Sequence, residues 1–295
     1  MDYRFFSSFC IAFMVMLNSL NAGYVSTTDS LLYLLNNNLV KDDAAKYELL
    51  CNIAFSTDDA DVKLQYSEQA IKLARKLDIF PAKALLFKGE GYLNSGKLDS
   101  AIACFINAAV YYQEERNNNG LASAYIYMSE AYNQLEDYSN AKYYLRNAVD
   151  IYQQEKDSFY LAVAFLNLGY VNYCMGQYDT TLILNTTAGE IFQKVQYTLG
   201  LTYCLGNSGL AYFKMSALEK AEDNLIRAIA TLNSGINDRA LTEYMIGYAG
   251  VLQQMGDLKK AMAYATRSYG MAVRNGFKEN TPQPVSGAFE PRLVA

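Results

Sequence analysis

One feature dominates this chain: residues of the same kind return every 40 positions. One series consists of small residues, at Gly89, Ser129, Gly169, Gly209 and Ala249. A second small series follows twelve residues later, at Ala101, Ala141, Thr181, Ala221 and Ala261. A fixed period of this size is typical of stacked repeats, in which each unit buries its apolar face against the next.

A short turn lies between the two series in each unit. Gly96, Gly176 and Gly256 each stand there, two positions before a large residue. Small side chains let two antiparallel helices approach closely, and glycine favours the left-handed conformation that ends a helix. We therefore predict two helices per unit. An earlier unit, with a small slip in register, is predicted to contain helices over residues 47–55 and 62–77.

The order of small residue, turn, large residue and alanine resembles the tetratricopeptide repeat. Leu166-Asn167-Leu168-Gly169 with Gly176-Gln177-Tyr178 is close to that family's consensus. The 40-residue length is similar to the longer-helix variant of kinesin light chains and bacterial peptide-sensing regulators. The resemblance covers residues 44–278 and implies an all-α fold, a right-handed α-α superhelix (a solenoid) of about six helix-turn-helix repeats. Its units would begin near residues 44, 82, 122, 162, 202 and 242.

The two ends of the chain have a different character. Residues 5–20 are nearly all apolar, yet they are fewer than the roughly 20 that a membrane helix needs. With Arg4 before them and Ala22 after them, they predict a signal peptide over residues 1–22 and export, to the periplasm of a bacterium. The alternative is an uncleaved membrane anchor through residues 5–20. Residues 23–43 are interpreted as a lead-in segment, and residues 279–295 as a disordered tail.

Composition narrows the function. The chain has no histidine, which excludes Ser/His and Cys/His nucleophile pairs and histidine-ligated metal sites, although carboxylate or lysine chemistry stays formally open. Its 30 acidic residues outnumber its 25 basic residues, so nothing in its charge favours nucleic acid. We therefore expect a non-enzymatic protein without cofactor or metal, whose partner is a protein or a peptide, and which meets a membrane only through the possible anchor.

The resemblance also suggests where such a partner would bind, because the first helix of each family unit lines the concave face of the array. The positions carried over are Asn94, Glu130, Asn133, Gln134, Tyr170, Tyr173, Tyr203, Lys214, Gln253 and Gln254, together with Lys83, Glu90, Ser123, Cys174, Phe213 and Glu243. Such side chains offer hydrogen bonds to a peptide backbone and flat area for stacking. The alternative is an ordinary solvated wall.

Two units depart from the repeat pattern. Residues 180–189 are rich in β-branched residues, which weaken helix propensity, and Asn185 stands where the family has an aromatic residue. That segment is either a hinge or a drifted repeat that packing holds in helical form. In the last unit, Ala265 replaces a large residue, and no polar capping helix follows. The array is therefore expected to end on an exposed apolar face, which indicates a missing continuation or a partner.

Four cysteines follow the apolar leader, at Cys51, Cys104, Cys174 and Cys204. All lie in helical patterns, where cysteine often serves as a small buried residue, so we predict free thiols. Cys174 and Cys204 are the alternative, because they lie on first helices of adjacent units and could pair in an exported protein.

A second resemblance concerns the order of segments. The leader, then Asp29-Ser30-Leu31-Leu32-Tyr33-Leu34-Leu35, then the repeats look like the periplasmic input region of Bacteroidetes sensor proteins. There the array precedes a membrane helix and a histidine kinase or DNA-binding output. This chain stops near the point where that helix would begin. Two hypotheses result: an exported scaffold that binds proteins or peptides, or a sensory input module of a signalling regulator that lacks its output domain.

Overall fold

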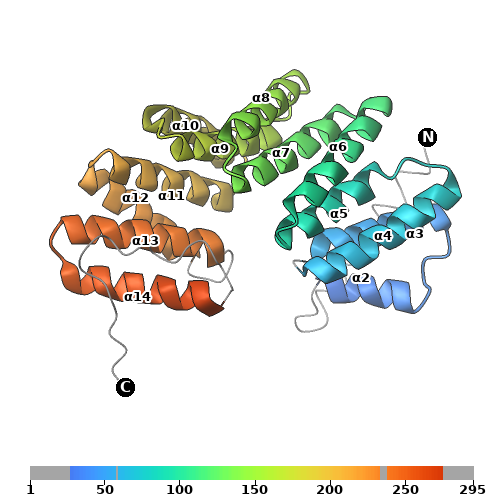
Figure 1. Cartoon of the computed structure of the whole chain (residues 1–295), viewed down its shortest axis with the longest axis horizontal. Coiled ribbons are helices and arrows are strands. Elements are labelled where there is room, and N and C mark those ends of the chain that lie inside the picture. Colours follow the sequence, from blue (N-terminus) through green and yellow to red (C-terminus); the bar gives the residue numbers. More distant parts are fainter. Residues whose placement is uncertain (1–26, 58, 233–237, 275–295) are drawn as a thin grey trace. The chain divides into compact units, whose positions relative to one another are not determined.

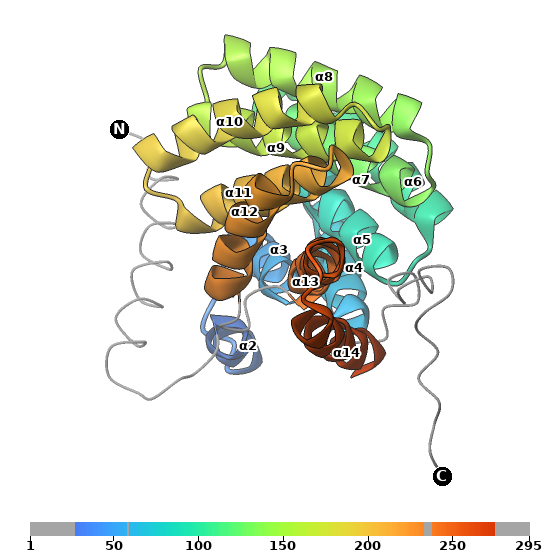
Figure 2. The same ribbon diagram turned by 90° about the vertical axis from the view of Figure 1, so that its left-hand side faces the viewer.

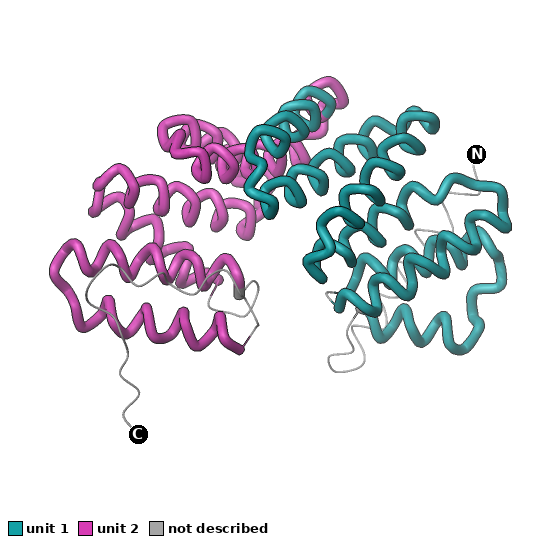
Figure 3. The backbone as a smooth tube through the Cα atoms, viewed as in Figure 1, with its two compact units in different colours: residues 1–151 teal, residues 152–295 magenta. Residues whose placement is uncertain are grey.

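The computed structural model describes residues 27–57, 59–232 and 238–274, and every regular element in this part of the chain is a helix. The helices form two compact units, residues 1–151 and residues 152–295, coloured separately in Figure 3. The predicted all-α fold is confirmed. The predicted signal peptide and tail lie outside the described residues, and both stay predictions.

Unit 1 contains a short leading helix followed by three helix pairs (Figure 1). The helices are α2 (Thr27–Asn36), α3 (Asp43–Ser56), α4 (Ala60–Leu77), α5 (Ala82–Asn94), α6 (Leu98–Glu114), α7 (Asn118–Gln134) and α8 (Tyr138–Gln154), whose last turn crosses the boundary between the units. Leu31 of α2 packs against Leu49 and Ile53 of α3, so the leading helix covers the apolar side of the first pair.

Unit 2 contains three further helix pairs. They are α9 (Ser158–Cys174) with α10 (Tyr178–Lys194), α11 (Thr198–Lys214) with α12 (Leu218–Leu232), and α13 (Asp238–Gln254) with α14 (Leu258–Arg274). Each first helix contacts its own second helix, and α9 and α11 also contact the first helix of the following pair. Figure 2 shows α13 and α14 side by side, viewed nearly end-on. This stacking places α9, α11 and α13 in succession.

Left-handed turns end the first helices, as the glycine pattern predicts. Gly96, Gly176 and Gly256 have φ angles of 72°, 74° and 88°. The same conformation occurs at Glu136 and Ser216, each with φ 59°, where the chain has no glycine. The repeat geometry therefore imposes the turn, and glycine only relieves its steric cost.

Small residues permit the close approach of paired helices. A Cβ added to Gly209 of α11 would lie 2.7 Å from Leu225 Cγ and 3.1 Å from the Leu225 backbone nitrogen of α12. In the preceding pair, the Thr181 hydroxyl donates a hydrogen bond to the Gly169 carbonyl oxygen at 3.0 Å. The two small series of the sequence therefore face each other there, as expected from their spacing.

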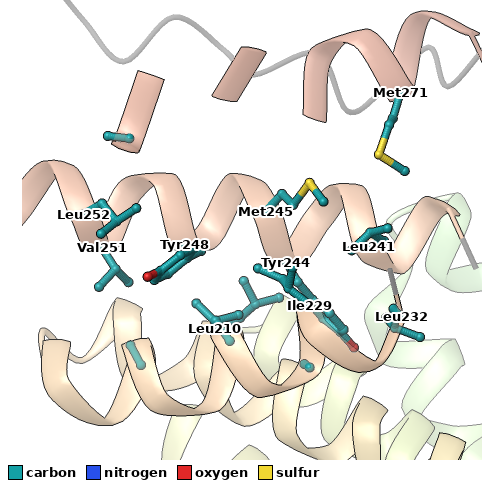
Figure 4. Packing of buried hydrophobic residues seen from close by; sticks show 14 residues of the cluster. Leu210, Ile229, Leu232, Leu241, Tyr244, Met245, Tyr248, Val251, Leu252 and Met271 are labelled. Atoms are coloured by element: carbon teal, nitrogen blue, oxygen red, sulfur yellow. The ribbon is translucent and has the colours of Figure 1, made fainter. Parts of the chain in front are cut away.

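The core of unit 2 continues on both sides of α13 (Figure 4). Tyr244 and Tyr248 point toward α11 and α12, where Leu210 meets them, and Met245 points toward Met271 of α14. The Tyr244 hydroxyl is buried and donates to Asn207 Oδ1 at 2.9 Å. A first helix in this unit thus joins its own partner helix to the preceding pair.

The segment 180–189 is an uninterrupted part of helix α10. Two of its threonines are satisfied locally: Thr186 and Thr187 donate to the carbonyl oxygens of Leu182 and Ile183, one turn earlier. Buried Asn185 donates from Nδ2 to Ser208 Oγ at 3.2 Å. These contacts favour a drifted repeat held by packing over a hinge.

None of the four cysteines of the described chain is in a disulfide, as predicted. Cys51 and Cys204 are buried, and burial raises the pKa of each thiol to about 12. Cys174 and Cys204 do not form the disulfide that was the alternative interpretation.

Candidate binding face on the first helices

Aromatic residues gather on the first helix of unit 2. Tyr170 and Tyr173 lie one turn apart on α9, with ring centroids 6.2 Å apart. The ring of Tyr178, at the start of α10, lies 5.8 Å from that of Tyr173. The three rings therefore form a continuous aromatic group, because each successive pair is within the range of favourable ring contacts.

An acidic residue from another first helix joins this group. The Tyr170 hydroxyl lies 3.3 Å and 3.5 Å from the two carboxylate oxygens of Glu243 on α13, and it donates to that carboxylate. Tyr170, Tyr173 and Glu243 are each partly buried. We call these three residues with Tyr178 the Tyr–Glu cluster.

Burial dominates the electrostatics of the Tyr–Glu cluster. It raises the pKa of the Glu243 carboxyl, while the hydrogen bond from Tyr170 and the positive charge of Arg239 act in the opposite direction. Burial, followed by the Glu243 charge, also raises the pKa of the Tyr170 and Tyr173 hydroxyls. Both tyrosines are therefore neutral hydrogen-bond donors at physiological pH.

The structure brings together only part of the predicted face. Tyr203 on α11 is partly buried and packs against the core, as Tyr173 does, but the ring contacts that join Tyr170, Tyr173 and Tyr178 do not include it. Lys214, Gln253 and Gln254 lie in the last turns of α11 and α13. Gln253 is ten residues from Glu243, or about 15 Å along the helix axis, too far to belong to the same contact region.

The predicted residues of unit 1 form a separate set. Asn94 and Glu130 are exposed, and Asn133 and Gln134 are partly buried in the last turn of α7. The buried Oδ1 atom of Asn133 accepts no hydrogen bond within the described structure.

Two other residues assigned to this face have structural partners. Lys83 lies 2.7 Å from the carboxylate of Glu48 and 3.4 Å from Asn52 Oδ1, so α5 is tied to α3. Glu90 lies 2.9 Å from the ammonium of Lys63, which is only 1% exposed. Glu90 Oε2 accepts no well-directed hydrogen bond, and the pair is an electrostatic contact inside unit 1.

Sequence reasoning placed Tyr170, Tyr173 and Glu243 on one face but could not predict that they meet. Tyr170 and Glu243 are 73 residues apart, which is not a multiple of the 40-residue period. Tyr178 was missed altogether, because its position in the repeat indicates a residue that seals the turn. Its aromatic character beside Tyr173, five residues earlier, was the only available signal.

Two structural features are absent from the described part of the chain. Within residues 27–57, 59–232 and 238–274, no three cysteine, aspartate or glutamate side chains converge as a metal site. In those ranges no helix has the length and apolar character needed to cross a membrane.

Comparisons with known proteins place the fold. No protein-family model matches the chain, and no curated protein sequence matches it. Among solved structures, the apo form of RapI has a TM-score of 0.69 at 17% identity, covering 90% of this chain and 97% of that one. A Rap protein complexed with competence and sporulation factor has a TM-score of 0.64 at 15% identity, covering 91% and 80%.

A third neighbour comes from Pyrococcus horikoshii and is a signal transduction ATPase with numerous domains and a tetratricopeptide repeat sensor. Its TM-score is 0.65 at 13% identity, covering 90% of this chain and 42% of that one. At these identities the comparisons establish the fold alone. The chain has a tetratricopeptide-like helical-repeat fold, as the resemblance in its sequence implies.

Proposed function

From this fold we propose that the chain is a non-enzymatic scaffold that binds a protein or peptide through the first-helix face of unit 2. The Tyr–Glu cluster carries the proposal. It combines flat aromatic area with a carboxylate that accepts hydrogen bonds, on partly buried side chains that three stacked helices hold in place. Surfaces that recognise polypeptides commonly combine rigid aromatic residues with nearby polar groups.

The neighbours support a binding role. One was solved in complex with competence and sporulation factor, and another uses its tetratricopeptide repeats as a sensor. The cluster gives catalysis no support, because burial and the Glu243 charge raise the pKa of the Tyr170 hydroxyl and keep it a neutral donor rather than an activated nucleophile.

A selection with random peptides tests this proposal and requires no identified partner. Phage-displayed peptides are enriched on the full chain and then measured against Tyr173→Ala. We expect their binding to fall at least tenfold, since truncation of a central aromatic residue at such a surface costs about 2 kcal/mol. Tyr143→Ala is the matched control, because Tyr143 is 59% exposed on α8, a second helix. Failure to enrich any peptide, or equal loss in both variants, refutes the proposal.

We further propose that the protein is exported and that its binding event serves signalling. The support is the apolar segment at residues 5–20 and the resemblance to periplasmic input regions. Fusion of residues 1–30 to a reporter that is active only outside the cytoplasm tests export directly. An inactive reporter, with the fusion shown to be expressed, would remove the periplasmic assignment but leave the binding proposal intact.

A further inference from the structure

The last described helix leaves an apolar stripe bare. On α14, Leu258 is 60% exposed, Met262 55%, Tyr269 50% and Val273 60%. At 3.6 residues per turn, these four side chains fall within about 60° of the helix circumference. The stripe therefore runs along almost the whole length of α14, beside the side that packs on α13.

The same side of the preceding second helix is covered. Ile229 of α12, forty residues before Tyr269, is only 4% exposed because α13 packs over it. Ala109 of α6, at the corresponding place, is 8% exposed. Tyr269 thus lies on the stacking side of a second helix with no following helix among the described residues. Val273 extends the stripe beyond that side, because Gln113 and Gln193, at its place in α6 and α10, are exposed.

The composition of α14 argues against another repeat as its natural cover. Leu225 of α12 contacts two first helices. It lies against Gly209 of α11, and a Cβ added to Gly247 of α13 would lie 3.6 Å from Leu225 Cδ1. In α6, the ring of Phe105 stacks on Tyr127 of the next helix at 5.4 Å. Ala265 holds the same position in α14 and is too short to bridge in this way.

Charge distinguishes α14 further. Lys259, Lys260, Arg267 and Arg274 make four basic residues, and α14 contains no acidic residue, in a chain whose formal net charge is −5. Lys260 pairs with Asp257, just before the helix, at 2.9 Å. A short apolar stripe beside a basic polar face is the pattern of helices that lie in the interface of an anionic bilayer.

We propose that α14 binds the surface of an anionic lipid bilayer, with the stripe inserted among the lipids and Lys259, the basic residue nearest the stripe, at the phosphate level. Arg267, Arg274 and Lys260 lie farther round the helix and add to its positive charge. The complementary charge draws the helix to the surface, and the four apolar side chains replace water with lipid. Tyr269 suits this depth, because its ring is apolar and its hydroxyl reaches the polar headgroups. The contact is peripheral and is independent of the Tyr–Glu cluster.

The absence of tryptophan from the chain allows a direct test. In the full-length Tyr269→Trp variant, the only indole lies on the stripe, so its fluorescence reports on α14 even if residues 5–20 also reach the lipid. With vesicles of phosphatidylglycerol and phosphatidylcholine, we expect its emission to move to shorter wavelength. High salt should reverse the shift, and pure phosphatidylcholine should produce little of it.

The matched reporter is Ile183→Trp, since Ile183 is 67% exposed on α10. Its emission should not change with either vesicle. Adding Lys259→Glu and Arg274→Glu to Tyr269→Trp should abolish the shift, whereas adding Lys72→Glu and Lys194→Glu, on α4 and α10, should not. Unchanged emission from Tyr269→Trp, equal shifts at both reporters, or a shift that is independent of lipid charge overturns the proposal. A shift that occurs without lipid and grows with protein concentration would instead assign the stripe to a second copy.

Discussion

The hydroxyl of Tyr170 on α9 lies 3.3 Å from a carboxylate oxygen of Glu243 on α13, although 73 residues separate them. Helix α11 contacts both α9 and α13, so this hydrogen bond depends on the stacking of three consecutive pairs. It brings the carboxylate of the α13–α14 pair to the aromatic residues of the α9–α10 pair. Any change that loosens the stacking in unit 2 therefore acts on the Tyr–Glu cluster as well.

Replacement of Glu243 by glutamine should stabilise the fold at neutral pH. Burial raises the folded-state pKa of this carboxyl, so folding favours its protonated form. The ionised carboxyl therefore lowers the free energy of unfolding. This loss is absent below the unfolded-state pKa of about 4.3 and reaches its full size above the raised folded-state pKa. Glutamine keeps the acceptor for Tyr170 but carries no charge.

Urea denaturation between pH 3.5 and pH 8 checks this expectation. The advantage of Glu243→Gln over the parent should grow as the pH rises from 4 and then become constant. Glu190→Gln, at an exposed site on α10, is the control. A Glu243→Gln variant that is less stable than the parent at pH 7 would show that the charge itself is needed for folding.

Glycine at the non-glycine turns should also stabilise the protein. Glu136 and Ser216 have φ 59°, a conformation that costs a residue with a side chain roughly 1–2 kcal/mol. Glycine removes this cost but adds about 0.4–1 kcal/mol of unfolded-state entropy. We expect the free energy of unfolding to rise by roughly 0–1.6 kcal/mol for each of Glu136→Gly and Ser216→Gly. Thermal unfolding measures it.

The reciprocal change tests the same reasoning. Nothing lies within 4 Å of a Cβ added to Gly96 or Gly256, so the turn conformation alone decides the cost of alanine. Gly96→Ala and Gly256→Ala should each lower the free energy of unfolding by about 1 kcal/mol. If all four variants unfold at the parent temperature, the left-handed turns do not limit stability.

The sequence was sufficient for features that depend on local spacing. The 40-residue period predicted paired helices, and Gly96, Gly176 and Gly256 predicted left-handed turns, because both depend on residues within one unit. Contacts between units could not be predicted in this way. The repeat pattern gives no information on whether Tyr170 bonds to Glu243, or whether Asn185 finds Ser208, since each partner lies in another pair. Low helix propensity at residues 180–189 was likewise outweighed by packing.

Alanine at the two glycines of adjacent helices should have opposite effects. A Cβ at Gly209 would meet Leu225 side-chain atoms at 2.7 Å and the Leu225 backbone nitrogen at 3.1 Å, and the backbone cannot yield. Overpacking of this kind costs about 1–3 kcal/mol. At Gly189 on α10 the nearest atom, Leu201 Cδ1, is 3.5 Å away. There alanine should add about 0.5–1 kcal/mol through helix propensity. Equal unfolding temperatures for Gly209→Ala and Gly189→Ala would contradict the close helix approach.

The buried pair of Lys63 and Glu90 should respond unequally to loss of either partner. The Lys63 side chain is 1% exposed and that of Glu90 is 22% exposed, with 2.9 Å between the charged atoms. Glu90→Gln leaves the buried Lys63 ammonium group without water or a counter-charge. We expect the free energy of unfolding to fall by about 3 kcal/mol. Lys63→Met fills the same space without charge, and the remaining Glu90 side chain is 22% exposed although its Oε2 atom is buried, so the free energy of unfolding should fall by less, about 1–2 kcal/mol.

Lys88 and Glu68 provide the control on the same two helices. They also lie 2.9 Å apart, but their side chains are 21% and 51% exposed, so Lys88→Met and Glu68→Gln should each cost about 1 kcal/mol or less. Urea denaturation of the four single variants and of the double variant Lys63→Met/Glu90→Gln measures each loss. The double variant should be more stable than Glu90→Gln alone, because it no longer buries an unpaired ammonium group. Equal losses for Lys63→Met and Glu90→Gln would show that exposure does not govern this pair, and that Lys63 reaches water by a route around α5.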